Sequence, residues 1–360
     1  RNLSIEVNGD IFHNLHLFAN PIDKFRPSDK EIQRALKKKK GSNLIYFGPG
    51  VHNLPNDTLF VPSGTTVYID GGARVYGNIF TEGAHDVNIF GRGEVHPDGR
   101  GAGVWVRRSK NVRIDGIVVS QLPIGQCDSV ELTNVKSISY YGWGDGMDVF
   151  SSSNVILDGV FCRNSDDCAA VYASTQGFKG GSNNVLVKNA TLWADVAHPI
   201  NIGGHGDPNG MDTVQNVTFR NIDILDQAEK QIDYQGCLAI NPGDNTLVRN
   251  ITFENIRIED FRNGQLVNFR ISFNPKYCVS TGRGIQNVLV KDVTYNGSGE
   301  NLSIIAGYDE NHKISGIRFV NLVVNGRKIT DDMPGKPKWY KTGDMAGIFV
   351  GEHVENLSFE

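Results

Sequence analysis

The stretch Val185-Leu186-Val187-Lys188-Asn189-Ala190 alternates apolar with other residues and then places an asparagine before a further apolar residue. The same pattern returns at residues 217–222, 251–256, 288–293 and 317–322, and a looser copy lies at 155–160. The copies start at 155, 185, 217, 251, 288 and 317, which is 30, 32, 34, 37 and 29 residues apart. A repeat of this length indicates stacked supersecondary units within one solenoid.

The period within each copy decides which solenoid this is. Alternation with a period of two is typical of a strand with one buried face, whereas helical repeats need apolar residues three and four positions apart. A leucine-rich repeat would need a Leu-x-x-Leu-x-Leu frame, which these segments lack. We therefore predict an all-β chain, a single-stranded right-handed parallel β-helix. The corner asparagines can adopt left-handed backbone conformations and could stack as a ladder at the ~4.8 Å strand spacing.

The beginning of the chain has a different pattern. Residues 28–40 predict a short helix, with Ser28 as its N-cap and Glu31 three residues later. Such a helix would cap the apolar end of the solenoid. We expect residues 1–43 to form this N-terminal segment and cap, and residues 44–360 to form the β-helix. The strand-like residues 15–21 could be the remnant of a preceding β-sandwich domain, because the chain starts abruptly at Arg1.

Composition and charge exclude several classes of protein. The net charge is −4, so there is no overall basic field that would attract nucleic acid. The basic run Lys37–Lys40 follows acidic residues and is expected to be a solvated helix end. No apolar run approaches the roughly 18–20 residues of a membrane span. Five cysteines without paired Cys-x-x-Cys motifs argue against zinc and leave at least one thiol unpaired.

Three acidic residues are candidates for catalysis. Asp145 lies in a glycine-rich segment, and the adjacent Asp166 and Asp167 follow 21 residues later, about one short coil. Stacking would bring them together on neighbouring coils. Two crowded carboxyl groups suit glycosidic cleavage, because one can stay protonated as the acid while another activates water. The alternative is that they bind calcium or occupy structural corners, although an adjacent Asp pair in a strand would drive one charge into the core.

The motifs around these acids resemble glycoside hydrolase family 28, the polygalacturonase family, and more distantly the β-helical dextranases of family 49. Residues 144–149 are similar to the first family motif, Asn-Thr-Asp-Gly-aromatic-Asp-Val, with Trp143-Gly144 in place of Asn-Thr. Residues 164–168, Asn-Ser-Asp-Asp-Cys, resemble the second motif, and residues 204–206, Gly-His-Gly, resemble the third. The resemblance implies a pectin-lyase-like solenoid that cleaves glycosidic bonds.

The resemblance also implies roles for individual residues. Asp166 would be the general acid, Asp145 and Asp167 would position and activate water, and His205 would hold the protonation state of the acid. Cleavage would invert the anomeric carbon, and neither a cofactor nor a metal is expected. The gap from Asp167 to His205 is longer than the family norm, consistent with an inserted loop near residues 174–183.

Candidate substrate-binding residues lie around these motifs. The family's Arg-Ile-Lys signature, which grips the uronate carboxylate, appears as Arg270-Ile271-Ser272, with the nearest lysine at Lys276. Trp143, beside Asp145, is a candidate platform for stacking a sugar ring. The full set of expected substrate-binding residues is Arg270, Trp143, Asp148, Tyr308 and Lys276.

These observations favour one function over three others. The first hypothesis is an inverting hydrolase of a pectic chain of the polygalacturonan or rhamnogalacturonan type. A hydrolase of a neutral α-glucan such as dextran, a polysaccharide lyase and a non-catalytic glycan-binding β-helix remain alternatives. A lyase would need a basic residue beside the acids, and Arg163 is the one candidate between 142 and 167. We expect a secreted or periplasmic monomer that acts on a polysaccharide and binds neither nucleic acid nor membrane.

Overall fold

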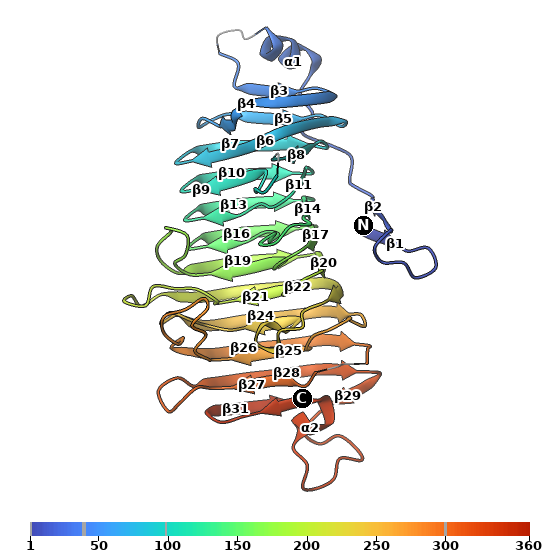
Figure 1. The fold of residues 1–360 in the computed structure, drawn as a ribbon, viewed down its shortest axis with the longest axis vertical. Coiled ribbons are helices and arrows are strands. Elements are labelled where there is room, and N and C mark those ends of the chain that lie inside the picture. Colours follow the sequence, from blue (N-terminus) through green and yellow to red (C-terminus); the bar gives the residue numbers. More distant parts are fainter. Residues whose placement is uncertain (1, 38–40, 98, 299–300) are drawn as a thin grey trace.

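The computed structural model describes residues 2–37, 41–97, 99–298 and 301–360. Short strands follow one another in coils, and each coil pairs in parallel with the coils before and after it (Figure 1). The predicted parallel β-helix is confirmed. Its strands form three sheets that run along the solenoid, joined where long strands pass from one sheet into the next.

The first sheet carries the repeated sequence motif. Its strands are β3 (Leu44–Phe47), β5 (Thr66–Ile69), β7 (His85–Gly91), β10 (Lys110–Asp115), β13 (Asp128–Thr133), β16 (Ser153–Asp158), β19 (Ser182–Lys188), β22 (Thr213–Gln227), β24 (Leu247–Ile258), β26 (Gly284–Tyr295), β28 (Ile314–Val324) and β31 (Val354–Phe359). The motif is in register from coil to coil, since Val185 pairs with Val217 and Val217 pairs with Ile251.

The second and third sheets complete each coil. The second contains β4 (Gly50–Phe60), β6 (Ala73–Glu82), β8 (Glu94–His96), β11 (Val118–Val119), β14 (Lys136–Ile138), β17 (Phe161–Asn164) and β20 (Thr191–Ala194), and continues into β22. The third starts at β6 and continues with β9 (Val104–Arg107), β12 (Ile124–Gly125), β15 (Val149–Phe150), β18 (Ala169–Tyr172), β21 (Ile200–Ile202), β23 (Leu238–Ile240), β25 (Val267–Arg270), β27 (Ser303–Ala306) and β30 (Ile348–Val350). A further strand, β29 (Arg327–Ile329), pairs antiparallel with β28.

The core is one continuous apolar column inside the coils. Alternate residues of each strand enter it: Val185 and Val187 are buried, while Leu186 between them faces outward. Phe219 and Phe253 stack on neighbouring coils with ring centroids 5.9 Å apart. Because every coil contributes to this column, removal of apolar surface from water is spread along the whole solenoid.

The predicted asparagine ladder is confirmed at the corners of the repeat. Asn189, Asn221 and Asn255 all have φ between 55° and 57°, in the left-handed region. The Asn221 amide donates to Asn189 Oδ1 at 2.7 Å, and the Asn255 amide donates to Asn221 Oδ1 at 3.3 Å. Asparagine tolerates this backbone region better than most residues, and its amide supplies both a donor and an acceptor to the coil on either side.

A short helix caps the first coil, as predicted. Helix α1 (Asp29–Leu36) has Ser28 as its N-cap, and Glu31 closes the predicted capping box by accepting from the Ser28 backbone at 2.8 Å. The helix ends earlier than the predicted boundary, with Lys37 as its C-cap, and residues 38–40 lie outside the described residues. At the other end, turns in residues 331–341 lead into a second short helix, α2 (Thr342–Ala346).

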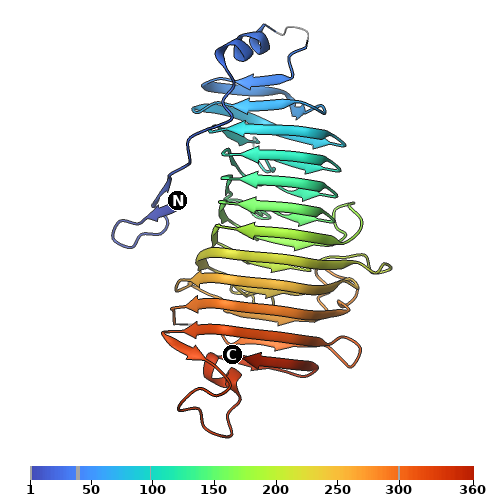
Figure 2. The same cartoon turned by 180° about the vertical axis from the view of Figure 1, so that it is seen from behind.

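The N-terminal arm, residues 2–28, lies outside the solenoid and runs along the flank of the second sheet (Figure 2). It contains an antiparallel hairpin of β1 (Asn2–Ile5) and β2 (Leu15–Phe18). Arg163 of β17 anchors it by donating to Asn14 Oδ1 and to the Ile11 carbonyl, and Phe18 packs against Phe161. The proposal that this hairpin is the remnant of a β-sandwich stays a prediction.

Two further properties concern the whole chain. No helix of the described residues is long and apolar enough to cross a membrane. All five cysteines are buried as free thiols: Cys127, Cys162, Cys168, Cys237 and Cys278.

Candidate active site

The loop that carries Asp145 joins β14 to β15 and is held by a buried asparagine. The Asn164 amide donates to Ser137 Oγ and Ser139 Oγ, both at 3.0 Å, and to the Asp145 carbonyl at 3.2 Å. Gly146 must lack a side chain, since a Cβ there would lie 2.2 Å from the Cys168 carbonyl oxygen. The loop conformation is therefore dictated by residues of the next coil.

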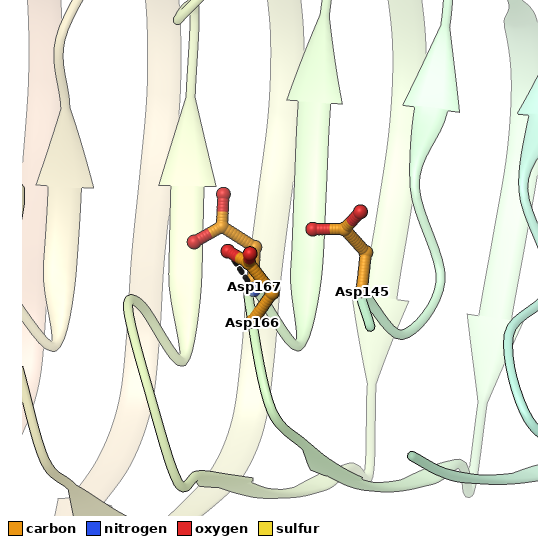
Figure 3. A group of neighbouring side chains, drawn as sticks. All are labelled: Asp145, Asp166 and Asp167. Atoms are coloured by element: carbon orange, nitrogen blue, oxygen red, sulfur yellow. Dashed lines mark hydrogen bonds between the residues drawn. The ribbon is translucent and has the colours of Figure 1, made fainter. Parts of the chain in front are cut away.

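Backbone hydrogen bonds stack this loop on the turn that carries the adjacent aspartates. The Gly146 N–H donates to the Asp167 carbonyl at 2.7 Å, and the Met147 N–H donates to the Cys168 carbonyl at 2.9 Å. Asp145, Asp166 and Asp167 consequently lie side by side on neighbouring coils (Figure 3). One carboxylate oxygen from each of the three lies within 4.8 Å of the others. The prediction that stacking gathers these acids is confirmed.

Asp166 and Asp167 sit in a bend before β18 and differ in burial. Asp166 is partly exposed, whereas Asp167 retains 5% of its accessible surface, so one of the two adjacent carboxylates does enter the interior. Burial of Asp167 is tolerated because four donors compensate for lost water. Its Oδ1 accepts from the His198 backbone at 3.0 Å and from the His198 ring at 2.7 Å. Its Oδ2 accepts from Tyr172 at 2.5 Å and from Asn201 at 2.8 Å.

The three carboxyl groups differ in electrostatic environment, and their pKa values shift in opposite directions. Burial by itself would raise the pKa of Asp167, but the nearby His198 and the hydrogen bonds to this carboxylate outweigh it and hold the pKa at about 2. Burial and then the Asp167 charge raise the pKa of Asp166 to about 7. Burial, followed by repulsion from Asp166 and Asp167, raises the pKa of Asp145 well above its ordinary value. One charged acid, Asp167, thus lies beside two carboxyl groups whose pKa values are raised.

The alternative role of the cluster is a calcium site. Calcium takes six to eight oxygen ligands. Both oxygens of Asp167 already accept two hydrogen bonds each, so Asp145 and Asp166 are left as the carboxylates with free lone pairs. This donor set fits proton transfer better than a calcium cage.

His198 contacts the cluster, and sequence reasoning did not single it out. Its ring bonds Asp167, and its charge is among the influences on the pKa of Asp166. The predicted His205 instead follows β21 and packs edge-on against Tyr172, with centroids 5.0 Å apart. Burial lowers the pKa of His205. The segment His198-Pro199 lacks the Gly-His-Gly pattern, but the shorter gap from Asp167 to His198 was an available signal.

Among the predicted substrate-binding residues, Trp143 and Asp148 lie on the Asp145 loop. Trp143 is 62% exposed and available for stacking. Asp148 is buried, and its Oδ1 has no hydrogen-bond partner. Burial, then the charges of the three clustered acids, raise its pKa well above the ordinary value. Asp148 is therefore a buried carboxyl group of the Asp145 loop and is not an exposed contact for substrate.

The other predicted residues lie further along the third sheet. Arg270 ends β25, three strands beyond β18, or roughly 14 Å at the strand spacing. Its guanidinium donates to Asp233 Oδ1 at 2.5 Å. The Lys276 ammonium lies over the rings of Tyr234 and Tyr277, at 5.3 and 4.9 Å. Tyr308 follows β27, one strand further still, so the structure does not bring it to the carboxylates.

Arg163, the candidate base for a lyase, lies away from the acids. It belongs to β17 in the second sheet and contacts the N-terminal arm. Its guanidinium pairs with Asp195 at 2.9 Å and donates to the arm. These contacts hold Arg163 away from the acids, so it cannot be the base of a lyase mechanism at Asp145 and Asp166.

A parallel β-helix with three clustered carboxyl groups on neighbouring coils is the arrangement expected of a β-helical glycoside hydrolase. A sequence model of that class, Glycosyl hydrolases family 28, matches residues 103–333, which include the whole cluster. The chain belongs to glycosyl hydrolase family 28.

Individual relatives agree with this assignment. The chain is 26% identical over 295 residues to a polygalacturonase from Juniperus ashei, covering 72% of this chain and 54% of the relative. It therefore spans about half the length of the curated relatives it matches. In fold it is similar to a family 28 exopolygalacturonase from Yersinia enterocolitica, with a TM-score of 0.63, 14% identity and coverage of 91% and 74%. Dex49A from Penicillium minioluteum is also similar, with a TM-score of 0.56, 15% identity and coverage of 80% and 56%.

Proposed function

We propose that this protein hydrolyses the glycosidic bonds of a pectic polysaccharide, of the polygalacturonan or rhamnogalacturonan type. The observation that carries the proposal is the separation of pKa values within the cluster. Asp166, with a pKa of about 7, can be protonated when Asp167, with a pKa of about 2, is charged. Neighbouring carboxyl groups whose environments push their pKa values apart are suited to acid and base roles.

In the proposed mechanism Asp166 is the general acid. Its proton passes to the glycosidic oxygen as the bond from that oxygen to the anomeric carbon breaks. The fixed charge of Asp167 stabilises the positive charge that develops on the sugar ring. His198 holds Asp167 in place through its ring and its backbone N–H.

Water activation falls to Asp145 and Asp167. A separation of no more than 4.8 Å leaves room for one water, which donates a hydrogen bond to Asp145 and is oriented by the charge of Asp167, whose oxygens already accept two hydrogen bonds each. Asp145 is the better proton acceptor once ionised because its pKa is raised, whereas Asp167 is a weak base. The water oxygen bonds to the anomeric carbon, and its proton passes to Asp145. Asp145 and Asp166 therefore share a single proton in the active form.

We propose that the configuration at the anomeric carbon inverts. The carboxylates here are closer than the roughly 6.5–9.5 Å found in most inverting glycosidases. Inversion at this short distance requires the water and the leaving oxygen to occupy opposite faces of the ring while both remain near Asp166. The anomer of the first product, followed by NMR during the reaction, tests this point: appearance of the retained anomer contradicts direct attack by water.

One observation favours a second substrate class. Arg270, expected to bind a uronate carboxylate, is already neutralised by Asp233. The position two residues later is Ser272, where the family signature has lysine. A site with little free positive charge suits a neutral α-glucan such as dextran. The pectic substrate remains the first proposal because of the polygalacturonase relatives.

We further propose that the protein acts outside the cell as a monomer. Its substrates are polymers of cell walls, which do not enter the cytoplasm. A secreted or periplasmic location is consistent with the polygalacturonase relatives.

The test is release of reducing ends from polygalacturonan, rhamnogalacturonan, dextran and pullulan. Wild type, Asp166→Asn and the control Asp292→Asn are compared; Asp292 is a corner residue of the asparagine ladder, whose Oδ1 accepts from the Asn321 amide. We expect release from one pectic substrate, a loss of at least ~10²-fold in Asp166→Asn, and an unchanged rate in the control. Equal rates in all three proteins would contradict the proposal.

A further inference from the structure

We propose that the substrate path is closed on the C-terminal side of the three aspartates, so that the enzyme removes short units from a chain end. This inference rests on the proposed function, because it describes how the same site holds a polysaccharide. It concerns the outward face of the third sheet, where Tyr172 and Asn201 project from β18 and β21 toward Asp167.

The face has two borders. The leading border consists of loops that precede the strands of the third sheet, including residues 139–148 before β15 and 228–237 before β23. The trailing border consists of loops that follow them, including residues 203–212 after β21 and 271–283 after β25. Each strand between the borders has two to four residues, so the face is roughly 7–13 Å wide. A polymer that lies along the face must pass between these borders.

Loop 271–283 crosses the face and meets the leading border. The Asn274 amide donates to the hydroxyl of Tyr234 at 2.6 Å, and the rings of Tyr234 and Tyr277 pack edge to face with centroids 5.2 Å apart. Tyr234 belongs to the short 3-10 helix Ile232–Tyr234 of the leading border. The pair Arg270 and Asp233 adds a charged contact between β25 and the same helix. We call these contacts the bridge.

The ring of Tyr277 also extends the bridge back toward the acids. It lies 6.2 Å from the ring of Trp143, two residues before Asp145, and 6.4 Å from the ring of His205. Trp143 is on the leading border and His205 on the trailing border. Tyr277 is therefore surrounded by aromatic rings from both sides, directly beyond the catalytic cluster.

The base of the crossing loop is rigidly held. Asp244 Oδ1 accepts from the backbone N–H groups of Val279 at 2.8 Å and Ser280 at 3.3 Å. The thiol of Cys278 donates to the Gly204 carbonyl at 3.3 Å, and a Cβ on Gly243 would lie 2.3 Å from the Cys278 sulfur. A loop packed this tightly is a fixed wall, because opening it would break these contacts together.

The space between the acids and the bridge is short. Asp167 precedes β18, and Tyr234 precedes β23, two strands later, so the distance along the face is roughly 10 Å, the length of about one or two sugar rings. A longer chain cannot continue past Tyr234 and Tyr277. The portion that enters this space must be a chain end, and the product is a mono- or disaccharide.

The other direction along the face is not bridged in the described residues. Loop 173–181 bends toward the N-terminal side, where Arg108 donates to the Gly177 carbonyl at 3.5 Å and the Lys179 N–H donates to Gln126 Oε1 at 3.4 Å. Arg108 and Gln126 both follow their strands, so these two contacts lie on the trailing border. Phe178 of the same loop covers part of the face: its ring stacks on Phe150 of β15 with centroids 6.2 Å apart, and Trp105 of β9 packs against this cluster. None of these contacts reaches the loops of the leading border, so the path beside that border stays open on the N-terminal side.

The experiment compares the product pattern with the fall in viscosity on the substrate that proves active. The wild type is expected to release mono- or disaccharide from the first minutes, while viscosity falls slowly. The double variant Asn274→Gly/Tyr277→Ala removes the crossing contacts. It is expected to produce longer oligosaccharides and a several-fold faster loss of viscosity per bond cleaved. Trp339→Ala, an exposed aromatic on the C-terminal loop, is the matched control and should retain the wild-type pattern.

The possible results distinguish failure of the closure from failure of the proposed function. A ladder of oligosaccharides from the wild type overturns the closure while leaving the hydrolase intact. A wild-type pattern in the double variant, with an unchanged melting temperature, shows that the bridge does not determine the product. If the double variant melts early, Tyr234→Ala alone provides the same comparison without altering the crossing loop. Absence of reducing ends from every polysaccharide overturns the proposed function and, with it, this inference.

Discussion

Asp166 and Asp167 are neighbours in the chain, yet the bend before β18 sends them into different surroundings. Asp167 turns inward to four hydrogen-bond donors, whereas Asp166 stays partly exposed beside Asp145. The motif at residues 164–168 predicted a pair of functional acids. Which of them would hold a proton depended on His198, Tyr172 and Asn201, whose positions follow from the stacking of two neighbouring coils.

Replacing the proposed acid is expected to lower activity without lowering the stability of the fold. Asp166→Asn should lower kcat by ~10²–10⁴-fold because the leaving oxygen loses its proton donor. A carboxyl group whose pKa is raised on folding destabilises the folded state at pH above its unfolded pKa, and this cost disappears as the group is protonated. The variant should therefore melt at an equal or higher temperature than wild type at pH 8, as measured by circular dichroism. A clearly lower melting temperature would indicate a structural role for Asp166.

The pH dependence follows from the pKa values of the same group. As the pH rises through about 7, Asp166 loses its proton and kcat/KM should decline. Below the optimum, Asp145 and Asp166 both become protonated and the base is lost, whereas Asp167, with a pKa of about 2, stays charged. A bell-shaped profile with its alkaline limb near pH 7 is expected for the wild type. An activity that keeps rising above pH 8 would be incompatible with Asp166 as the acid.

At the scale of the elements, the corner asparagines share one local preference, the left-handed backbone conformation, which recurs from coil to coil. Asn221 has φ of 57° and bonds the asparagines of the coils on both sides. A non-glycine residue other than Asn or Asp pays roughly 1–2 kcal/mol for this backbone conformation. The repeated Asn in the sequence was therefore sufficient to predict both the corner and the ladder.

Two substitutions at Asn221 separate the contributions of its hydrogen bonds and of its backbone conformation to the stability of the fold. Asn221→Gly keeps the backbone conformation and loses the ladder bonds, which should cost about 1 kcal/mol. Asn221→Ala loses the bonds and adds the backbone penalty, for a total of about 2–3 kcal/mol. The melting temperatures should fall in the order wild type, Gly, Ala. If Gly and Ala are equal, backbone conformation is not what the asparagine supplies.

At the scale of the whole molecule, the N-terminal arm ties the capped end of the solenoid to its middle coils. Arg163 joins Asp195, Asn14 and the Ile11 carbonyl, and its side chain retains 11% of its accessible surface. Arg163→Ala should lower the melting temperature by several degrees, because the loss leaves buried partners unpaired. It should also raise amide hydrogen exchange in residues 11–18.

An exposed ion pair provides the control for this variant. Arg220 pairs with Glu254 at 2.8 Å on the outer face of the first sheet, and its side chain is 54% exposed. Arg220→Ala should change the melting temperature by about one degree at most, since exposed pairs contribute ~0–1 kcal/mol. Equal effects of the two substitutions would mean that the arm adds nothing to the stability of the solenoid.

The sequence by itself determined the parallel β-helix, its asparagine corners, the helical cap and the gathering of the three acids. These features depend on local rules: alternation of apolar residues, backbone preferences of Asn, a capping box, and a spacing of one coil between Asp145 and Asp166. Such rules repeat along a solenoid, because every coil contacts its neighbours in nearly the same way.

Only the tertiary structure decided which histidine contacts the acids, how deeply Asp167 is buried and how far the substrate path extends. His198 reaches Asp167 from the following coil, and Tyr234, Asn274 and Tyr277 meet across a face formed by strands of other coils. These contacts join loops of irregular length, which carry no periodic signal in the sequence. Their positions follow from packing between loops, and that packing exists only once the coils are stacked.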